Sequence, residues 1–298
     1  MKVHCKIGLV MTLCLALPLA AFAEVNFSLG DKGEVRLGGS LQSLARYSDF
    51  RNPNSSDADS GVDFFLRRGI FRLGGDYTDF LRFFFQTEGA VATDNDAGLR
   101  ISDASLNIHY REIAQLIMGL QRVPVNRSIL TSDDSLMAID RPGITGYNLT
   151  WGLRGRVEFD TAALRNSNSG IWGPYHDRDL GATLFGAFSA NDMLHFKYYG
   201  GIYRGIQQSD DGQDNPRFAG RIQMNLFDPE PDYLNQGTYL GTKKTIAFGY
   251  SNDTQQDVTT NLKDGKGVAY KAFNQVDLFM EYPLGPGSAT FEGAYLHT

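Results

Sequence analysis

Apolar and polar residues alternate along nearly the whole chain, and no long amphipathic helix interrupts the pattern. In the stretch 151–160, WGLRGRVEFD, the tryptophan, leucine, valine and phenylalanine share one parity, while Arg154, Arg156 and a glutamate share the other. Because a strand points successive side chains to opposite faces, this stretch predicts a ribbon with one apolar and one charged face. A strand of a soluble sandwich alternates in the same way. Recurrence along the chain, with acidic or Gly/Asn-rich loops between segments, is instead typical of a transmembrane β-barrel with an apolar lipid face and a polar lumen.

We therefore predict an all-β fold, an antiparallel transmembrane β-barrel with twelve strands in this chain. Short turns on one side and long loops on the other are typical of outer-membrane barrels. The last segment reaches Thr298 without the terminal aromatic residue common in bacterial barrels, so we expect a C-terminally truncated larger barrel; a closed small barrel is the alternative. The predicted strands cover approximately residues 34–47, 64–76, 81–88, 99–110, 114–121, 151–160, 180–188, 194–202, 217–226, 244–250, 273–282 and 288–298.

Residues 1–23 have the pattern of a secretory signal peptide. Two lysines precede an apolar run, which is followed by the small-x-small cleavage site Ala21-Phe22-Ala23. We predict cleavage there, which leaves a barrel domain of residues 24–298. The run is short for a transmembrane helix. Both cysteines, Cys5 and Cys14, lie in the signal. The mature chain thus has no disulfide, no thiolate zinc site and no cysteine nucleophile.

Charge and hydropathy exclude several classes of protein. The chain has a formal net charge of −6, and loss of the two signal lysines lowers Lys+Arg from 28 to 26 against 34 Asp+Glu, giving −8. Such an acidic protein is a poor candidate for binding nucleic acid. After the signal no apolar run approaches the ~20 residues of a membrane helix. The histidines lack metal-ligand spacing, and there is no nucleophile elbow or phosphate-cradling glycine motif, so we predict no enzyme, metal site or cofactor.

The parity of the charged residues predicts a basic lumen inside an acidic protein. The inward-facing acids are fewer than the inward-facing bases. These acids are Glu34, Glu88, Glu158, Asp179, Asp277, Glu281 and Glu292. Rings of arginine and lysine select anions, and the planar guanidinium suits oxyanions. Alternatively, each arginine pairs with an acid of the wall and only lines a water-filled interior. The inward bases are Arg36, Arg46, Arg68, Arg72, Arg82, Arg154, Arg156, Lys197, Arg217, Arg221 and Lys243.

The connection 122–146 is the longest before the stretch 151–160 and has no clear strand pattern. It carries Arg122, Arg127 and Arg141 together with Ser132 and two aspartates. Loops of this length within a compact domain are usually functional or disordered.

Seven segments of the chain follow one another in this order: FLRRGIFRLGG, ISDASLNI, MGLQRVP, RDLGATLFGAF, FAGRIQMNLF, TYLGTKKTIAFGYS and FMEYPLGPGSATFEGAYLH. Together they resemble the phosphate-selective porin family (porins O and P) of the bacterial outer membrane, in which the matching segments have the same order. The match extends over almost all of the mature chain. The resemblance implies a sixteen-stranded homotrimeric barrel, of which twelve strands are present here, and a pore narrowed by the third long loop.

The resemblance also implies the residues of an anion constriction. Arg67 and Arg68 match the family's arginine pair, and Ser132 and Arg141 match a serine and an arginine that face the anion. Two positions depart from the pattern: Ile129 stands where a phosphate-binding lysine is expected, and Ser40 where an arginine is expected. Secondary candidates for the lumen are Arg82, Arg122, Arg127, Arg154, Arg156, Arg217 and Arg221.

From these observations we predict an outer-membrane porin for the passive diffusion of small anions, with phosphate or another oxyanion favoured. Its expected partners are small anions, outer-membrane lipid and two further copies of itself in a homotrimer. One alternative is a general porin of low selectivity. The other is a secreted or outer-membrane β-protein with a structural or adhesive role and no transport.

Overall fold

The computed structural model describes residues 23–28, 30, 33–51, 58–91, 97–141, 178–205, 215–260 and 267–297. These residues form one twelve-stranded antiparallel sheet in which every strand pairs with its neighbours in the sequence. The predicted all-β antiparallel fold is thus confirmed. Within the described ranges, no helix is both long and apolar enough to cross a membrane.

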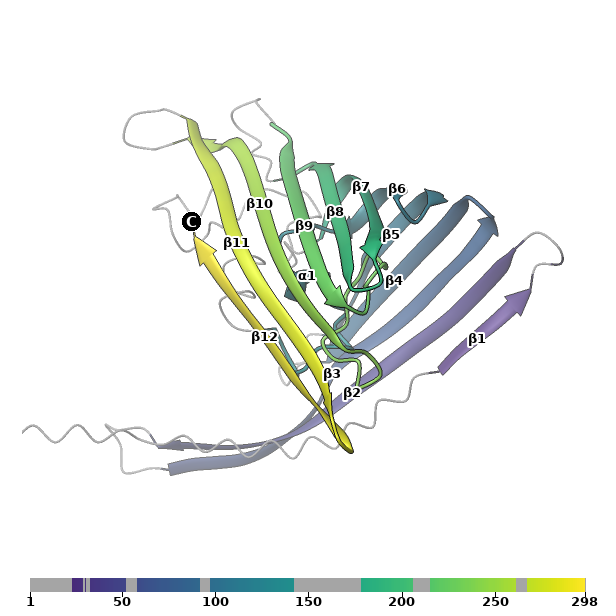
Figure 1. Cartoon of the computed structure of the whole chain (residues 1–298). Coiled ribbons are helices and arrows are strands. Elements are labelled where there is room, and N and C mark those ends of the chain that lie inside the picture. The colour runs from purple at the N-terminus through teal and green to yellow at the C-terminus, as the bar shows by residue number, and fades with distance from the viewer. Residues whose placement is uncertain are drawn as a thin grey trace, which may run out of the picture.

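The sheet runs from β1 at one edge to β12 at the other (Figure 1). Its longest strand is β3, with 21 residues, followed by β2 and β11 with 18 residues each. The strands are β1 (Ala23–Ser28), β2 (Glu34–Arg51), β3 (Ala58–Thr78), β4 (Leu81–Val91), β5 (Ala97–Arg111), β6 (Ala114–Arg122), β7 (Arg178–Asn191), β8 (Leu194–Tyr203), β9 (Arg217–Phe227), β10 (Thr245–Thr260), β11 (Gly267–Leu284) and β12 (Gly287–His297).

The described residues contain twelve strands, the number predicted for the chain, but the two sets differ in two strands. β1 was not predicted; it begins at Ala23, the last residue of the predicted signal, and pairs with β2. The stretch 151–160 lies outside the described residues. Its predicted place as sixth strand, between β6 and β7, is wrong, because those two strands pair directly from Gln115↔Phe185 to Arg122↔Arg178. Alternation specifies a two-faced ribbon and does not specify its neighbours in a sheet.

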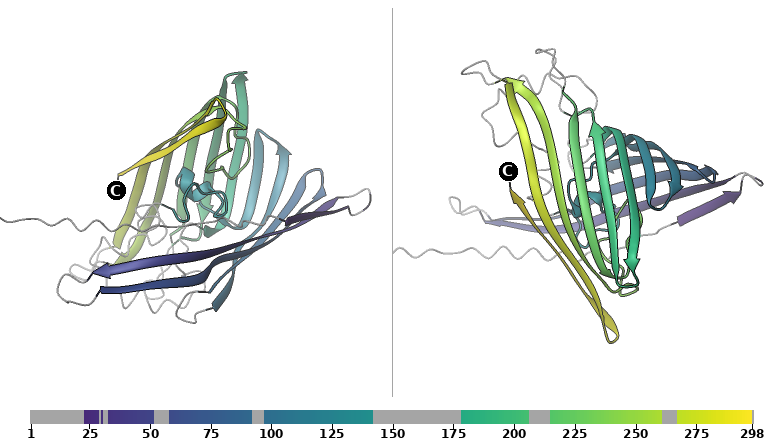
Figure 2. Two further views of the ribbon diagram at one scale, coloured as in Figure 1. Left: turned by 90° about the horizontal axis from the view of Figure 1, so that it is seen from below. Right: turned by 45° about the horizontal axis from the view of Figure 1, so that its top comes forward.

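The sheet is strongly curved, and its concave side encloses other parts of the chain (Figure 2). The short helix α1 (Arg127–Leu130) lies on this concave side. Among the described residues, β12 pairs with β11 and β1 with β2, and the two edge strands do not pair with each other. The views in Figures 1 and 2 show these edges well apart.

The polarity of the two faces is the reverse of that in a soluble sheet. On β9, the apolar Phe218 and Ile222 are 50% and 62% exposed, whereas Arg221, Gln223 and Asn225 are buried. The same alternation recurs on most other strands and agrees with the parity prediction there, although the buried face also carries the aromatic residues Phe185, Tyr199 and Phe279. The exposed apolar residues on the convex face include Leu41, Tyr47, Leu180, Leu184, Phe188, Ile202, Phe248, Tyr250 and Tyr282.

Two connections enter the concave side and meet there. Residues 123–141 follow β6, and residues 228–244 join β9 to β10. Because connections in an antiparallel meander alternate between the two ends of the sheet, these two come from opposite ends. They join through the bridge Thr131↔Asn235 and the bond from Asn235 N to Leu130 O, 2.9 Å long. Both connections lie on the concave side of the sheet, next to strands β6 to β9.

The contact between α1 and the wall is apolar. Val123, Val125 and Ile129 pack with Tyr203 and Ala219 in one buried cluster. A second cluster joins Leu130 to Ile117, Phe185 and Tyr199, with Tyr233 of the other connection packed against it. These contacts fix α1 against the sheet, and they place the polar residues that follow it opposite β3.

Candidate functional site

Arg67 and Arg68 point to the same carboxylate, although adjacent strand residues normally point to opposite faces. The β2–β3 register shifts between Gln42↔Arg68 and Ser43↔Leu66, so Arg67 is the extra residue of a β-bulge. As a result both side chains contact Asp140. Arg67 Nη2 and Arg68 Nη2 each lie 2.5 Å from Asp140 Oδ1. Strict parity would have placed only Arg68 on this side.

Arg141, which follows Asp140 in the sequence, contacts the carboxylate of Asp133 instead. Asp133 accepts hydrogen bonds from Arg141 and from Arg122 Nη2, the latter at 2.5 Å. Arg178 Nη2 lies 3.3 Å from the same carboxylate. Burial alone would raise the pKa of the Asp133 carboxyl, but the charges of Arg122, Arg141 and Arg178 hold it well below its usual range. Asp133 is therefore ionised and clamped by three guanidinium groups.

Ser132 contacts a third carboxylate of the same loop, that of Asp134. Its Oγ donates to Asp134 Oδ1 at 2.5 Å and accepts from Arg72 Nη2 at 3.3 Å. Arg72 also pairs with Asp134, with 2.6 Å between Nη1 and Oδ2. Ser40 Oγ contacts the same carboxylate at 3.4 Å. The four predicted constriction residues thus gather in one network, which we call the arginine cluster. It comprises Arg67, Arg68, Arg72, Arg122, Arg141 and Arg178 with Glu88, Asp103, Asp133, Asp134 and Asp140.

Six arginines therefore face five carboxylates, and the predicted excess of inward positive charge is smaller than expected. The parity census left out acids that the structure buries or pairs on the concave side, among them Asp76, Asp103 and Asp253. A register shift in the β4–β5 pairing, after Gln86↔Asp103, turns Ser102 and Asp103 inward together. Loop acids supply the rest, because residues 133–140 fold back onto the wall.

Arg127 forms the centre of a separate network. It is fully buried on α1, and its Nη1 and Nη2 donate to Glu230 at 2.7 and 2.6 Å. Its Cζ lies 3.6 Å from the centroid of the Phe279 ring. Burial would raise the pKa of Glu230, but the charge of Arg127 lowers it well below the ordinary value. Glu230 also accepts from Gln223 and Asn225, both at under 3 Å. This network locks one connection to the other.

Three further predicted lumen arginines lie elsewhere on the concave face and also have carboxylate partners, whereas Lys197 donates to Asp232 O and Asn235 Oδ1. Arg217 forms a two-pronged pair with Asp253, at 2.8 and 2.7 Å. Arg221 pairs with Asp277 and also donates to Ser251 at 3.0 Å. Arg82 Nε lies 2.9 Å from Asp76. Arg154 and Arg156 lie outside the described residues.

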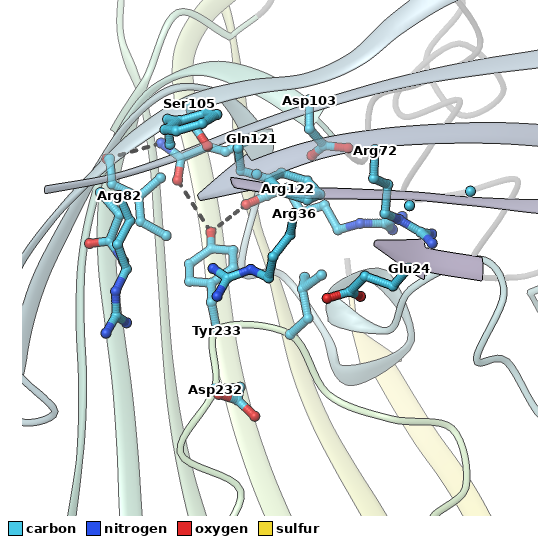
Figure 3. Close-up of a pocket in the computed structure, with 18 residues that line it drawn as sticks. Glu24, Arg36, Arg72, Arg82, Asp103, Ser105, Gln121, Arg122, Asp232 and Tyr233 are labelled. Atoms are coloured by element: carbon cyan, nitrogen blue, oxygen red, sulfur yellow. Dashed lines mark hydrogen bonds between the residues drawn. The ribbon is translucent and has the colours of Figure 1, made fainter. Parts of the chain in front are cut away.

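A cavity of about 460 Å³ lies between the β2–β6 wall and residues 232–234. Figure 3 shows Tyr233 at its centre, with the hydroxyl directed toward Gln121 and Arg122. That hydroxyl donates to Arg122 O at 2.5 Å. Four labelled arginines approach the cavity from several strands: Arg36, Arg72, Arg82 and Arg122. Three acidic residues also line it, namely Glu24, Asp103 and Asp232. The lining combines these charged side chains with apolar ones, among them Phe83, Phe84 and Ile117.

Ile129 stands where the resemblance predicts a lysine, and its surroundings give a physical reason for an apolar residue there. Its side chain is completely buried in the apolar cluster under α1, where a lysine would be desolvated. Sequence reasoning also missed residues that the structure brings into the networks. Arg178 sits at the start of β7, where Asp179 beside it is buried as well, so parity carried no signal. Glu230 and Tyr233 lie in a connection with no periodic pattern.

The described residues contain no group of three or more histidine, cysteine, aspartate or glutamate side chains arranged to hold a metal ion. What the site offers chemically is a set of guanidinium donors held at fixed positions by carboxylates, hydroxyls and backbone carbonyls. Such donors bind oxyanions through charge-assisted hydrogen bonds. Comparison of the chain with protein-family models finds no match, and comparison with curated protein sequences finds none either.

Proposed function

We propose that the chain forms a β-barrel pore in a bacterial outer membrane, reached through a cleaved signal peptide, and that small anions diffuse through it. The observation that carries this proposal is the reversed polarity of the sheet. Large apolar side chains such as Phe64, Leu99 and Ile222 stand exposed on one face, while arginines are buried on the other. Lipid is the solvent in which this arrangement is favourable, because its apolar chains cover the exposed face.

The direction of selectivity is proposed from the arginine cluster. Guanidinium groups from β3, β6, β7 and the connection 123–141 meet on the concave side, next to α1. Oxyanions, phosphate among them, are the solutes that match the planar donor geometry. Assembly into a homotrimer, as in the family that the sequence resembles, belongs to the same proposal.

The second candidate is a general pore of low selectivity. It is favoured by the near balance of six arginines and five carboxylates in the cluster. Paired charges of both signs polarise the passage without giving it a strong net field. The two candidates share one fold and differ in a single measurable ratio, that of anion to cation permeability.

The test is the reversal potential of the full chain in a planar bilayer under a potassium chloride gradient. We expect anion preference, and we expect the triple variant R67A/R68A/R141A to lower the anion-to-cation permeability ratio about tenfold, which corresponds to the loss of ~1.4 kcal/mol from charge-assisted hydrogen bonds. The matched control is R111A, since Arg111 is exposed at a turn beside Tyr110. Cation preference in the unaltered pore would refute the anion proposal. A ratio near one that is insensitive to all three substitutions would favour the general pore.

A further inference from the structure

The carboxylate of Asp140 occupies the position that an oxyanion would take between Arg67 and Arg68. One oxygen, Oδ1, accepts from both guanidinium groups at 2.5 Å, and Oδ2 lies 3.4 Å from Arg67 Nε. Both adjacent arginines can reach it only because the bulge at Arg67 turns them to the same side. The loop therefore presents its own anion to the pair. A carboxylate oxygen and a phosphate oxygen make the same kind of contact to a guanidinium.

Asp140 differs from Asp133 in how firmly it is held. The Asp133 side chain is 5% exposed and has three arginine partners, whereas the Asp140 side chain is 52% exposed. Removing a buried carboxylate from its partners leaves uncompensated buried charge, which is costly. A half-exposed carboxylate can move into water at little cost, because exposed ion pairs contribute little free energy. Of these two loop carboxylates, Asp140 is the one that a solute can replace.

Arg68 also has contacts with the wall that do not involve Asp140. Arg68 Nη1 also donates to Gln42 Oε1 at 2.9 Å and to Ile139 O at 2.7 Å, and its Nε lies 3.7 Å from Glu88. The contacts with Gln42 and Glu88, which belong to β2 and β4, hold Arg68 in the wall independently of the loop that carries Asp140 and Ile139. An incoming anion would thus find donors already oriented.

We propose that Asp140 is a built-in competitor for the anion site of the Arg67–Arg68 pair, so that small oxyanions bind there by displacing its carboxylate. This inference rests on the proposed anion pathway. A competitor lowers the apparent affinity for the anion in proportion to the fraction of time for which the site is open. If the Asp140 carboxylate occupies the site for about nine-tenths of the time, the apparent affinity for the anion falls roughly tenfold. Weakened binding speeds release, and conduction requires that a bound ion leave.

The experiment measures block of chloride current by inorganic phosphate through the full chain in planar bilayers. We expect D140N to lower the half-blocking phosphate concentration roughly tenfold, whereas D140E, which keeps a carboxylate, stays near the unaltered value. The matched control is D63N. Asp63 is similarly exposed, at 42%, and pairs with Arg46 at 2.8 Å outside the arginine cluster, so this variant removes the same charge. An unchanged or raised half-blocking concentration in D140N would overturn the proposal.

A second measurement needs no variant. Saturating phosphate should release Asp140 in the unaltered protein, so amide hydrogen exchange of residues 136–141 should become faster while that of β8 and β9 stays constant. Slower or unchanged exchange of residues 136–141 would count against the competitor. Failure of the underlying function is distinguishable, because it would appear as the absence of anion-selective current in the unaltered protein. Anion-selective current with no effect of D140N would reject the competitor alone.

Discussion

At the scale of single residues, the concave side is organised by carboxylates as much as by arginines. Asp133 and Asp140 each bridge two or more guanidinium groups, and each comes from the loop that follows α1. The arginines are consequently oriented before any solute arrives. The same pairing reduces the net field, so the number of solute-accessible donors matters more than the number of arginines.

The loop carboxylates should make docking of residues 131–141 sensitive to acid. Burial opposes ionisation, but arginine partners lower the pKa of Asp133, Asp134 and Asp140 below their ordinary values in the folded protein. A depressed folded-state pKa contributes stability that is fully present above the unfolded value of about 3.9 and is lost as pH falls through the folded value. We expect hydrogen-exchange protection of this segment, corrected for intrinsic rates, to stay constant from pH 7 to about pH 5.

Below about pH 4 the protection should fall, and the protection due to Asp133 should be lost last because its pKa is lowered furthest. The amides of β8 and β9 provide the internal reference. Loss of protection already near pH 6 would mean that these carboxylates do not hold the loop.

At the scale of elements, two connections from opposite ends of the sheet meet on its concave side. Among the described residues, the one helix or strand longer than a single bridge in these two connections is α1, with four residues. They are ordered by contact with the sheet and with each other, through Thr131↔Asn235 and the Arg127–Glu230 pair. The width of any passage is therefore set by tertiary docking of two non-periodic segments.

The Arg127–Glu230 pair should be a strong coupling point between these connections. In E230Q the fully buried Arg127 guanidinium would lose its charge partner, and we expect a destabilisation of docking of about 3 kcal/mol. Hydrogen exchange of residues 127–131 and 230–238 measures it. E34Q is the control, because the Glu34 side chain is 42% exposed on β2.

A double-mutant cycle separates this coupling from general damage. R127A/E230A should be less destabilised than the sum of the single variants, by about 2 kcal/mol. The release of the connections should also raise single-channel conductance in E230Q. Strict additivity, with unchanged conductance, would show that the two connections dock independently.

At the scale of the whole molecule, the division of faces predicts which solvent surrounds the sheet. Ile222 stands in the middle of β9 and is 62% exposed on the apolar face. In a bilayer, I222R should lower the free energy of unfolding by about 2–4 kcal/mol, since arginine is unfavourable near the midplane on the lipid face. Urea titration in lipid vesicles measures this cost.

M193R is the matched control for that substitution. Met193 is 57% exposed at the turn between β7 and β8, where an arginine should cost little. A secreted soluble β-protein would give the opposite pattern, because an exposed arginine would then be tolerated at both positions and would improve solubility. Equal and small effects of I222R and M193R, in a protein that stays monodisperse without detergent, would refute the membrane proposal.

The sequence predicted those features of the fold that depend only on the alternation of side chains with a period of two residues. Alternation located eleven of the strands and assigned Phe218 and Arg221 to opposite faces, because side-chain direction in a strand follows from backbone geometry alone. The candidate constriction residues Arg67, Arg68, Ser132 and Arg141 were named from a family resemblance, and the structure gathers them in one network.

Tertiary structure decided register, bulges and docking. The pairing of β6 with β7, the inward turn of both Arg67 and Arg68, and the entry of Asp133 and Glu230 into the concave side follow no sequence period. Each depends on contacts between segments tens of residues apart. The sequence showed that the connection after β6 carries Arg127 and Arg141, but the choice of a carboxylate partner is settled only where distant parts of the chain compete for the same space.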